Sequence, residues 1–187
     1  MKVSRAEVIQ TRERILVSAA RLFRKHGFDG VNVARIMKTA GLTHGAFYGY
    51  FKSKDDLIAQ VLARILMPGP DIPSDRPRDF QEYASSYLSA THRDDPAEGC
   101  PYPALGCEIA RAPRAVRKVV TTAAAERIEQ FSKSAPGKTQ QGRRRAAIMG
   151  WSAMIGAVLL SRIVDDPELS NEILEETRAA LKRNKSS

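Results

Sequence analysis

Residues 32–54 constrain the fold of this chain more than any other stretch, because they have the pattern of two short helices joined by a glycine turn. Asn32 is a favourable helix N-cap, and apolar side chains follow it at the spacing of one buried helical stripe. Gly41 ends this first helix, since glycine readily adopts the positive φ at which many helices terminate. In the second helix, Phe47 and Phe51 lie four residues apart and point inward together. The pattern predicts a helix-turn-helix.

The predicted second helix leaves an unusual set of residues exposed. Thr43 is placed to cap it, and its outward positions carry tyrosines and glycines as far as Tyr50. An exposed aromatic surface is unfavourable in water unless something binds there. Lys52 and Lys54 follow, and Ser53 between them is placed to cap a further helix, whose free N–H groups suit a phosphate. This aromatic and basic face predicts a DNA-binding surface.

Longer helices flank this pair. The preceding helix has Ser4 and Glu7 spaced as a capping box, and Gly27 follows its basic end. The following helix is expected to end near Met67, because the proline- and glycine-rich sequence MPGPDIPSDRP cannot continue it. Three helices around one small core, and then a connector, are therefore predicted.

Three motifs of this region occur in order and without gaps: A-x-x-L-F-x-x-x-G-F, then A-G-L-T, then F-Y-x-Y-F-x-S-K-D-x-L. Residues 8–62 thereby resemble the N-terminal domain of the tetracycline-repressor (TetR/AcrR) family of bacterial regulators. The resemblance implies that the start of the second helix lies near base edges of DNA, and that its tyrosines contact the DNA backbone or thymine methyl groups. The predicted DNA-binding residues are Asn32, Val33, Thr43, His44, Gly45, Tyr48, Gly49, Tyr50, Lys52 and Lys54.

Two of these positions depart from the family pattern. Gly49 stands where many relatives have a large side chain, and it costs about 1 kcal/mol of helix stability relative to alanine. It also removes one possible base contact. His44 replaces a residue that is often lysine, which changes a contact to phosphate or guanine.

The distribution of charge supports the same interpretation. Residues 1–54 hold 11 basic and three acidic residues, so +8 of the total formal charge of +9 lies there. A local basic excess is typical of phosphate binding, whereas a uniformly basic chain would indicate solubility or nonspecific adhesion. The alternative, a merely solvated basic face, stays open for Arg12, Arg14 and Arg21.

The rest of the chain is predicted to be helical as well, because nothing in it shows strand alternation. Helices are expected at about 80–88, 104–111, 114–133, 142–163 and 167–183, with a loop at 92–103 and a flexible break at 134–142. The expected fold is all-α with about nine helices: a three-helix helix-turn-helix DNA-binding domain at 1–52, and a helical effector-binding and dimerisation domain at 53–187. A connector helix at about 53–67 would join the two.

Residues 146–161 carry no charge on any side of their predicted helix, so both faces must be covered. One cover is the domain itself. The resemblance implies that the last two helices supply the other by forming a four-helix bundle across a two-fold axis. The predicted dimer-interface residues are Gly150, Ala153, Gly156, Ala157, Leu160, Ile173, Thr177 and Leu181. The alternative is that this helix is only the central core helix of a monomer.

An effector pocket is expected where aromatic, sulfur and small apolar side chains turn inward in the C-terminal domain. The candidate residues are Tyr83, Tyr87, Tyr102, Leu105, Ile109, Phe131, Met149, Trp151 and Met154. This lining favours an apolar or aromatic compound. Cys100 and Cys107 admit a redox-sensing pair or inert packing, and no four-ligand cluster suggests a metal.

The resemblance implies a ligand-responsive DNA-binding regulator, usually a repressor, that binds a pseudo-palindromic operator as a homodimer. Two alternatives remain open: a DNA-architectural protein without sequence preference, and an interaction adaptor that has kept the fold but lost DNA binding. The motifs of common enzymes are missing from the sequence, so no catalysis and no cofactor are expected. No signal peptide and no apolar run of about 18–20 residues is apparent, so a cytoplasmic protein without membrane contact is expected.

Overall fold

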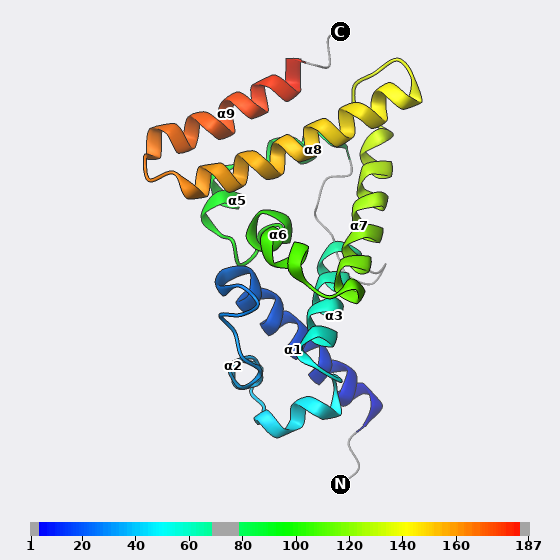
Figure 1. Ribbon diagram of the computed structural model, residues 1–187, viewed down its shortest axis with the longest axis vertical. Helices are drawn as coiled ribbons and strands as arrows, with labels where there is room; N and C mark the ends of the chain where they lie inside the picture. Colours follow the sequence, from blue (N-terminus) through cyan, green and yellow to red (C-terminus); the bar gives the residue numbers. More distant parts are fainter. Residues whose placement is uncertain (1–3, 69–78, 184–187) are drawn as a thin grey trace.

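The structure of the protein is a computed structural model that describes residues 4–68 and 79–183. Throughout these residues the secondary structure is helical, which confirms the all-α prediction (Figure 1). The elements are α1 (Arg5–His26), α2 (Val33–Thr39), the 3-10 helix η1 (His44–Gly49), α3 (Lys54–Leu66), α4 (Phe80–Tyr87), α5 (Ala90–Asp94), α6 (Pro101–Arg111), α7 (Arg114–Ser132), α8 (Gln140–Ile163) and α9 (Pro167–Arg183). Most of the proline-rich segment predicted to follow α3 lies outside the described residues.

Local capping explains where the N-terminal helices begin. The Ser4, Asn32 and Ser53 side chains accept hydrogen bonds from the third residue of α1, α2 and α3, which confirms all three predicted N-caps. Gly27 and Gly41 have φ of 75° and 74° and end α1 and the turn after α2. Glycine reaches this region without steric cost, so these stops are encoded locally.

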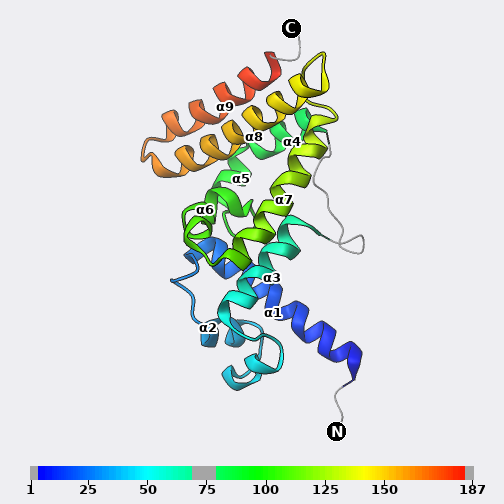
Figure 2. The ribbon, with the colours of Figure 1, turned by 45° about the vertical axis from the view of Figure 1, so that its right-hand side comes forward.

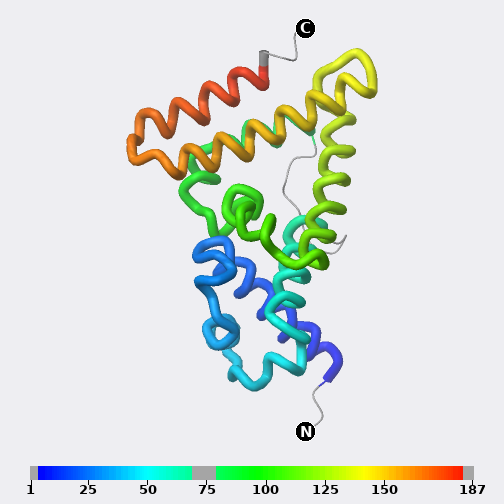
Figure 3. The backbone as a smooth tube through the Cα atoms, in the orientation of Figure 1, coloured from blue at the N-terminus to red at the C-terminus, as the bar shows by residue number. Residues whose placement is uncertain are grey.

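The molecule is elongated, and its two ends carry different elements (Figures 1 and 2). α1, α2, η1 and α3 form one end, and the paired helices α8 and α9 cross the other. The α6 and α7 helices lie between them. In the backbone tube, α1 and α9, the first and last of the described helices, lie at opposite ends of the molecule (Figure 3).

Each end of the molecule is built around its own hydrophobic core. The first contains the inward residues of α1, α2, η1 and α3, including Phe23, Phe47 and Leu62, but Leu105 and Val116 of α6 and α7 complete it. The second lies between α4, α8 and α9, with Phe131 of α7 inserted into it. Since α7 contributes to both cores, it joins the two ends of the molecule independently of α3.

The segment predicted as a loop at 92–103 is partly helical. Ser89 Oγ accepts a hydrogen bond from His92 N at 3.2 Å and starts the short helix α5. Pro101 stands in the first turn of α6, where its missing N–H costs nothing and its fixed φ suits a helix. The predicted loop was therefore wrong over the residues of α5 and the first turn of α6, where Pro101 begins a helix.

The helix α8 is long and apolar enough, by length and composition, to cross a membrane. The expectation that no segment reaches this limit was therefore wrong. A core helix of a water-soluble protein passes the same test, and seven α8 residues are buried inside this fold, among them Trp151, Met154 and Val158.

Candidate DNA-binding surface

The predicted recognition helix is a 3-10 helix in the structure, not an α-helix. Thr43 precedes it but makes no side-chain capping bond, which corrects the predicted cap. Two glycines among its six residues, Gly45 and Gly49, explain the departure, because glycine disfavours a regular helix and a 3-10 turn suits a short segment. Phe47 anchors the turn to the first core and is 1% exposed.

The outward side of η1 is left open. Tyr48 is 71% exposed, and Thr43 and His44 are exposed beside it. A Cβ atom added at Gly45 or Gly49 would meet nothing within 4 Å. Neither glycine has positive φ, so the chain itself requires glycine at neither position. The missing side chains instead leave the backbone of η1 accessible from outside.

Tyr50 differs from Tyr48. It is half-buried and packs against the first core, so much of its ring contributes to folding. At the start of α2, Asn32 is exposed, but its Oδ1 atom accepts a hydrogen bond from Arg35 N at 2.8 Å. Val33 is half-buried against the same core. DNA contacts by Asn32, Val33 and Tyr50 stay predictions. Because these side chains are partly buried or already hydrogen-bonded, they offer DNA a smaller accessible surface than the sequence implied.

The two lysines beside Ser53 have different environments. Lys52 is exposed next to η1. Lys54 is half-buried, and its Nζ atom donates a hydrogen bond to the Phe28 carbonyl oxygen at 2.5 Å. A partly desolvated ammonium group requires such a partner. Lys54 therefore stabilises the connection between α1 and α2, and its contact with a phosphate stays a prediction.

Asp56 completes a reciprocal cap at the start of α3. Its backbone N–H donates to Ser53 Oγ at 3.1 Å, while its carboxylate accepts from Lys52 N at 2.9 Å and from Gln60 Nε2 at 2.7 Å. These bonds lower the pKa of the Asp56 carboxyl, with the Lys52 backbone bond as the largest cause and the Gln60 bond next. The cap therefore fixes where Lys52 and η1 sit relative to α3.

We expect Asp56→Asn to lower the free energy of unfolding by about 1 kcal/mol at pH 7, the usual value of such a cap. Because the folded-state pKa is lowered, the carboxylate stabilises the fold above its unfolded pKa of about 4, and this contribution disappears as the pH falls through the folded value. Urea unfolding of both proteins at several pH values tests this. A difference that stays constant into acid would contradict it.

Sequence reasoning missed two basic residues near this surface. Arg35 and Lys38 are exposed on α2, one turn before the chain enters η1. The Arg35 guanidinium lies 3.0 Å from the Nε2 atom of His26. The missed signal was the polar side of α2, whose charges lie opposite the buried Ile36 and Met37.

The predicted effector-pocket residues divide between the two cores. Leu105 and Ile109 are buried in the first core, and Met149 is 63% exposed, so these three do not line a C-terminal pocket. The other residues lie together around the second core: Tyr83, Tyr87, Tyr102, Phe131, Trp151 and Met154. Cys100 is buried and Cys107 exposed, both as free thiols.

The predicted dimer-interface residues also divide. Ala157 and Leu181 are buried, and a side chain at Gly150 would collide with Phe80. These three positions are therefore covered by other residues of the same chain and are not available to a second chain. Ile173 and Thr177 are half-buried. The outer face of α8 instead carries a seam of five residues with alternating spacings of four and three: Met149, Ala153, Gly156, Leu160 and Ile163. Met149, Leu160 and Ile163 are 63%, 52% and 67% exposed.

Comparison with known proteins connects this geometry to a family. Residues 15–61, which include α2 and η1, match the family described as bacterial regulatory proteins, tetR family. The chain is 40% identical over 58 residues to the HTH-type transcriptional regulator AcrR of Shigella flexneri, covering 31% of this chain and 27% of AcrR. It is 33% identical over 72 residues to the HTH-type transcriptional repressor BepR of Brucella suis, covering 38% of this chain and 34% of BepR. The alignments thus span about a third or less of these relatives.

Solved structures resemble the whole chain, not only its N-terminal part. The crystal structure of the reduced form of NemR from Escherichia coli has a TM-score of 0.68 and 21% identity, covering 93% of this chain and 96% of NemR. A TetR-family transcriptional regulator of Streptomyces coelicolor, SCO4454, has a TM-score of 0.66 and 22% identity, covering 96% of this chain and 97% of its own. At such identities the likeness is one of fold. Through residues 15–61, the chain is therefore similar to the tetR family of bacterial regulatory proteins.

Proposed function

We propose that the protein is a sequence-specific transcriptional regulator, and specifically a repressor that binds a pseudo-palindromic operator as a homodimer and is released by a small effector. The observation that carries this proposal is the open face of η1. It combines an exposed tyrosine, Tyr48, with two glycines that the fold itself does not require. Such a face admits close approach of a major groove, where side chains read base edges.

The seam of α8 supports the homodimer. Spacings of four and three residues repeat every seven, and apolar residues at this repeat pack against a second helix as in a coiled coil. The seam lies at the end of the molecule away from η1, so pairing there leaves both η1 helices free (Figure 1). Two recognition elements about 34–36 Å apart would enter successive major grooves of an inverted repeat.

Contacts between α6 and the DNA-binding domain support effector control. The Glu108 carboxylate of α6 accepts a hydrogen bond from Phe28 N at 2.7 Å, in the connection between α1 and α2. Lys54 of α3 donates a hydrogen bond to the Phe28 carbonyl oxygen. A shift of α6 would therefore reach α2 and η1 through Phe28. AcrR and BepR are described as a transcriptional regulator and a repressor, so we propose a regulatory, cytoplasmic role without catalysis or cofactor.

Selection of randomised duplex DNA by the purified protein tests the proposal. The winning sequence and a scrambled duplex are then titrated at two salt concentrations. We expect an inverted repeat that binds about 10³-fold or more above the scrambled duplex. Equal affinity for both duplexes, falling steeply with salt, would indicate a DNA-architectural protein. Lack of binding to either duplex would indicate an interaction adaptor.

Tyr48→Ala is expected to weaken binding to the selected duplex by at least about tenfold, since one specific contact contributes roughly 1–3 kcal/mol. The free energy of unfolding should change by less than about 1 kcal/mol, because the 71% exposed side chain lies outside the core. Fluorescence anisotropy and urea unfolding measure the two quantities. Thr122→Ala, at an exposed position of α7, is the matched control. Equal affinities of the Tyr48→Ala and control variants would remove η1 from the interface.

A further inference from the structure

Arg24 is a buried cation at the junction between the DNA-binding end of the molecule and the rest. It stands in the last turn of α1, and its side chain is 7% exposed. Its Nε atom donates a hydrogen bond to the Ala97 carbonyl oxygen at 2.5 Å, and its Nη2 atom lies 3.9 Å from the Glu98 carboxylate. Arginine is almost never buried unless it is paired. The position of Arg24 therefore depends on a segment of the C-terminal domain.

The segment 95–99, which lies between α5 and α6, presents these acceptors in a fixed arrangement. The Asp95 carboxylate accepts hydrogen bonds from Ala97 N at 3.1 Å and from Glu98 N at 3.3 Å. An aspartate that accepts from the backbone two residues further on forms a turn by itself. The Ala97 carbonyl oxygen is thereby ordered before it meets Arg24.

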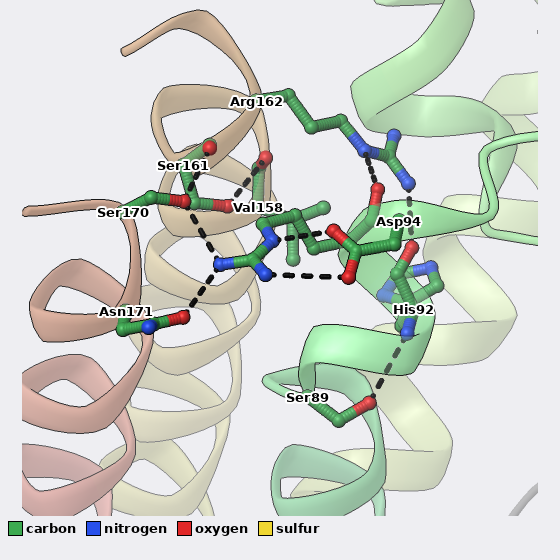
Figure 4. A network of polar contacts seen from close by, with 9 residues as sticks. Ser89, His92, Asp94, Val158, Ser161, Arg162, Ser170 and Asn171 are labelled. Carbon is green, nitrogen blue, oxygen red and sulfur yellow. Dashed lines mark hydrogen bonds and ion pairs between the residues drawn. The ribbon is translucent and has the colours of Figure 1, made fainter. Parts of the chain in front are cut away.

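This segment is also connected to the opposite end of the molecule, through α5 (Figure 4). Arg162 of α8 donates hydrogen bonds to the carbonyl oxygens of Arg93 at 2.9 Å and His92 at 2.7 Å. The Arg93 guanidinium in turn donates to Ser170 Oγ at 2.9 Å and Asn171 Oδ1 at 2.7 Å, both of α9. Hydrogen bonds therefore link the α8–α9 pair to α5, which leads directly into the segment that α1 contacts.

Apolar packing alone does not fix the angle between the two ends. Leu105 and Val116 complete the first core, but the hydrophobic effect is non-directional, so one apolar surface can slide on another. A hydrogen bond, in contrast, weakens steeply away from its preferred angle. Arg24 and Glu108 both make such bonds across the junction. Arg24 is buried and Glu108 exposed, so water replaces the bond of Arg24 less easily.

The segment has space to move if the bond to Arg24 is lost. Residues 98–100 border a cavity of about 110 Å³, which Tyr87 and His92 also line. A loosened segment can shift into this space without first opening a core. The orientation of α1, and with it that of the DNA-binding end, then becomes less defined.

We propose that Arg24 is a positioning residue that fixes the orientation of η1 relative to the α8 seam, and thereby determines which spacing between operator half-sites the dimer accepts. The inference deepens the proposed function and rests on it. A rigid link between two binding elements favours one separation, whereas a looser link tolerates several at lower affinity. One added base pair moves a half-site by about 3.4 Å and turns it by about 35°. An orientation fixed by directional bonds discriminates against this change.

A panel of operator duplexes tests the proposal. The spacer of the selected inverted repeat is kept, or shortened or lengthened by one and two base pairs, and each duplex is titrated with the wild-type protein and with Arg24→Gln. We expect a change of one base pair to lower wild-type affinity at least about tenfold, and the affinity of Arg24→Gln less than about threefold. Loss of stability alone would weaken binding to all duplexes in proportion. An Arg24→Gln protein with the wild-type spacing profile would therefore overturn the proposal.

Two further variants complete the test. Lys25→Gln removes the same charge at the next, exposed position of α1 and should keep the wild-type spacing profile. An equally broadened profile in this control would assign the effect to charge and overturn the role of Arg24. If Arg24→Gln does not fold, Asp95→Ala decides, because it removes the turn that orders the Ala97 carbonyl oxygen and leaves the DNA-binding end untouched. An unchanged profile in Asp95→Ala would then count against the proposal.

A measurement without DNA separates this inference from the proposed function. Spin labels attached at Lys38→Cys, on the exposed side of α2, report the distance between the DNA-binding ends of a dimer; Cys107→Ser removes the exposed native thiol. We expect the distance distribution to broaden in Arg24→Gln. Selection of an inverted repeat with equal distributions and equal spacing profiles would overturn only the role of Arg24. Broadening in a dimer that selects no DNA would overturn the regulator and retain Arg24 as the residue that orients η1.

Discussion

Replacing Leu160 and Ile163 of α8 with aspartate is expected to convert the proposed dimer to a monomer. The two side chains are 52% and 67% exposed on the apolar seam, so the fold of a single chain does not bury them. In a two-fold dimer each substitution occurs twice, and four carboxylates would enter the seam without partners. Burying unpaired charge is strongly unfavourable, so the dimer dissociation constant should rise by roughly 10³-fold or more.

Sedimentation equilibrium measures the change, and circular dichroism checks that the helices remain. Ala125→Asp, which adds the same charge at an exposed position of α7, is the matched control and should stay dimeric. The monomer should also lose most of its affinity for an inverted repeat, because each chain then binds one half-site. An unchanged dimer constant in the Leu160→Asp, Ile163→Asp protein would place the interface on another surface.

The second large effect is expected for Phe47→Ala. Phe47 is 1% exposed, stacks on Phe51 with ring centroids 5.6 Å apart, and meets the Tyr48 ring edge-on at 5.3 Å. Removing a buried phenylalanine leaves a cavity and typically lowers the free energy of unfolding by about 3–5 kcal/mol. That is a large share of the usual total of about 5–15 kcal/mol. Urea unfolding at pH 7 measures the loss.

Phe47→Ala should abolish DNA binding as well, since Phe47 attaches η1 to the first core through its ring. Its carbonyl oxygen also accepts from Tyr50 N at 2.9 Å and Phe51 N at 3.1 Å, so backbone order beyond η1 depends on its position. Tyr48→Ala separates the two effects, because it alters the DNA-facing side and leaves this anchor in place. A Phe47→Ala protein with normal stability would show that η1 is held by other contacts.

Much of the candidate DNA-binding surface was predictable because its signals are local. His44 and Tyr48 were assigned to the outward side of the second helix from spacing alone, and both are exposed on η1. The orientation of Lys54 was not predictable, since it depends on the Phe28 carbonyl oxygen, which is contributed by the α1–α2 connection. In α8, the small residue Gly150 was interpreted as an interface position, but Phe80 of α4 packs over it.

What the sequence by itself determined is most of the helices and several of their ends. Ser4, Asn32 and Ser53 cap three of them and Gly27 ends one, through contacts with residues a few positions away. Only the tertiary structure decided which apolar faces meet. It joined α6 and α7 to the first core, exposed the α8 seam, and brought Tyr87, His92 and Cys100 to one cavity. Caps and periodicity depend on neighbours along the chain, whereas these arrangements depend on packing between segments far apart in sequence, which no local pattern specifies.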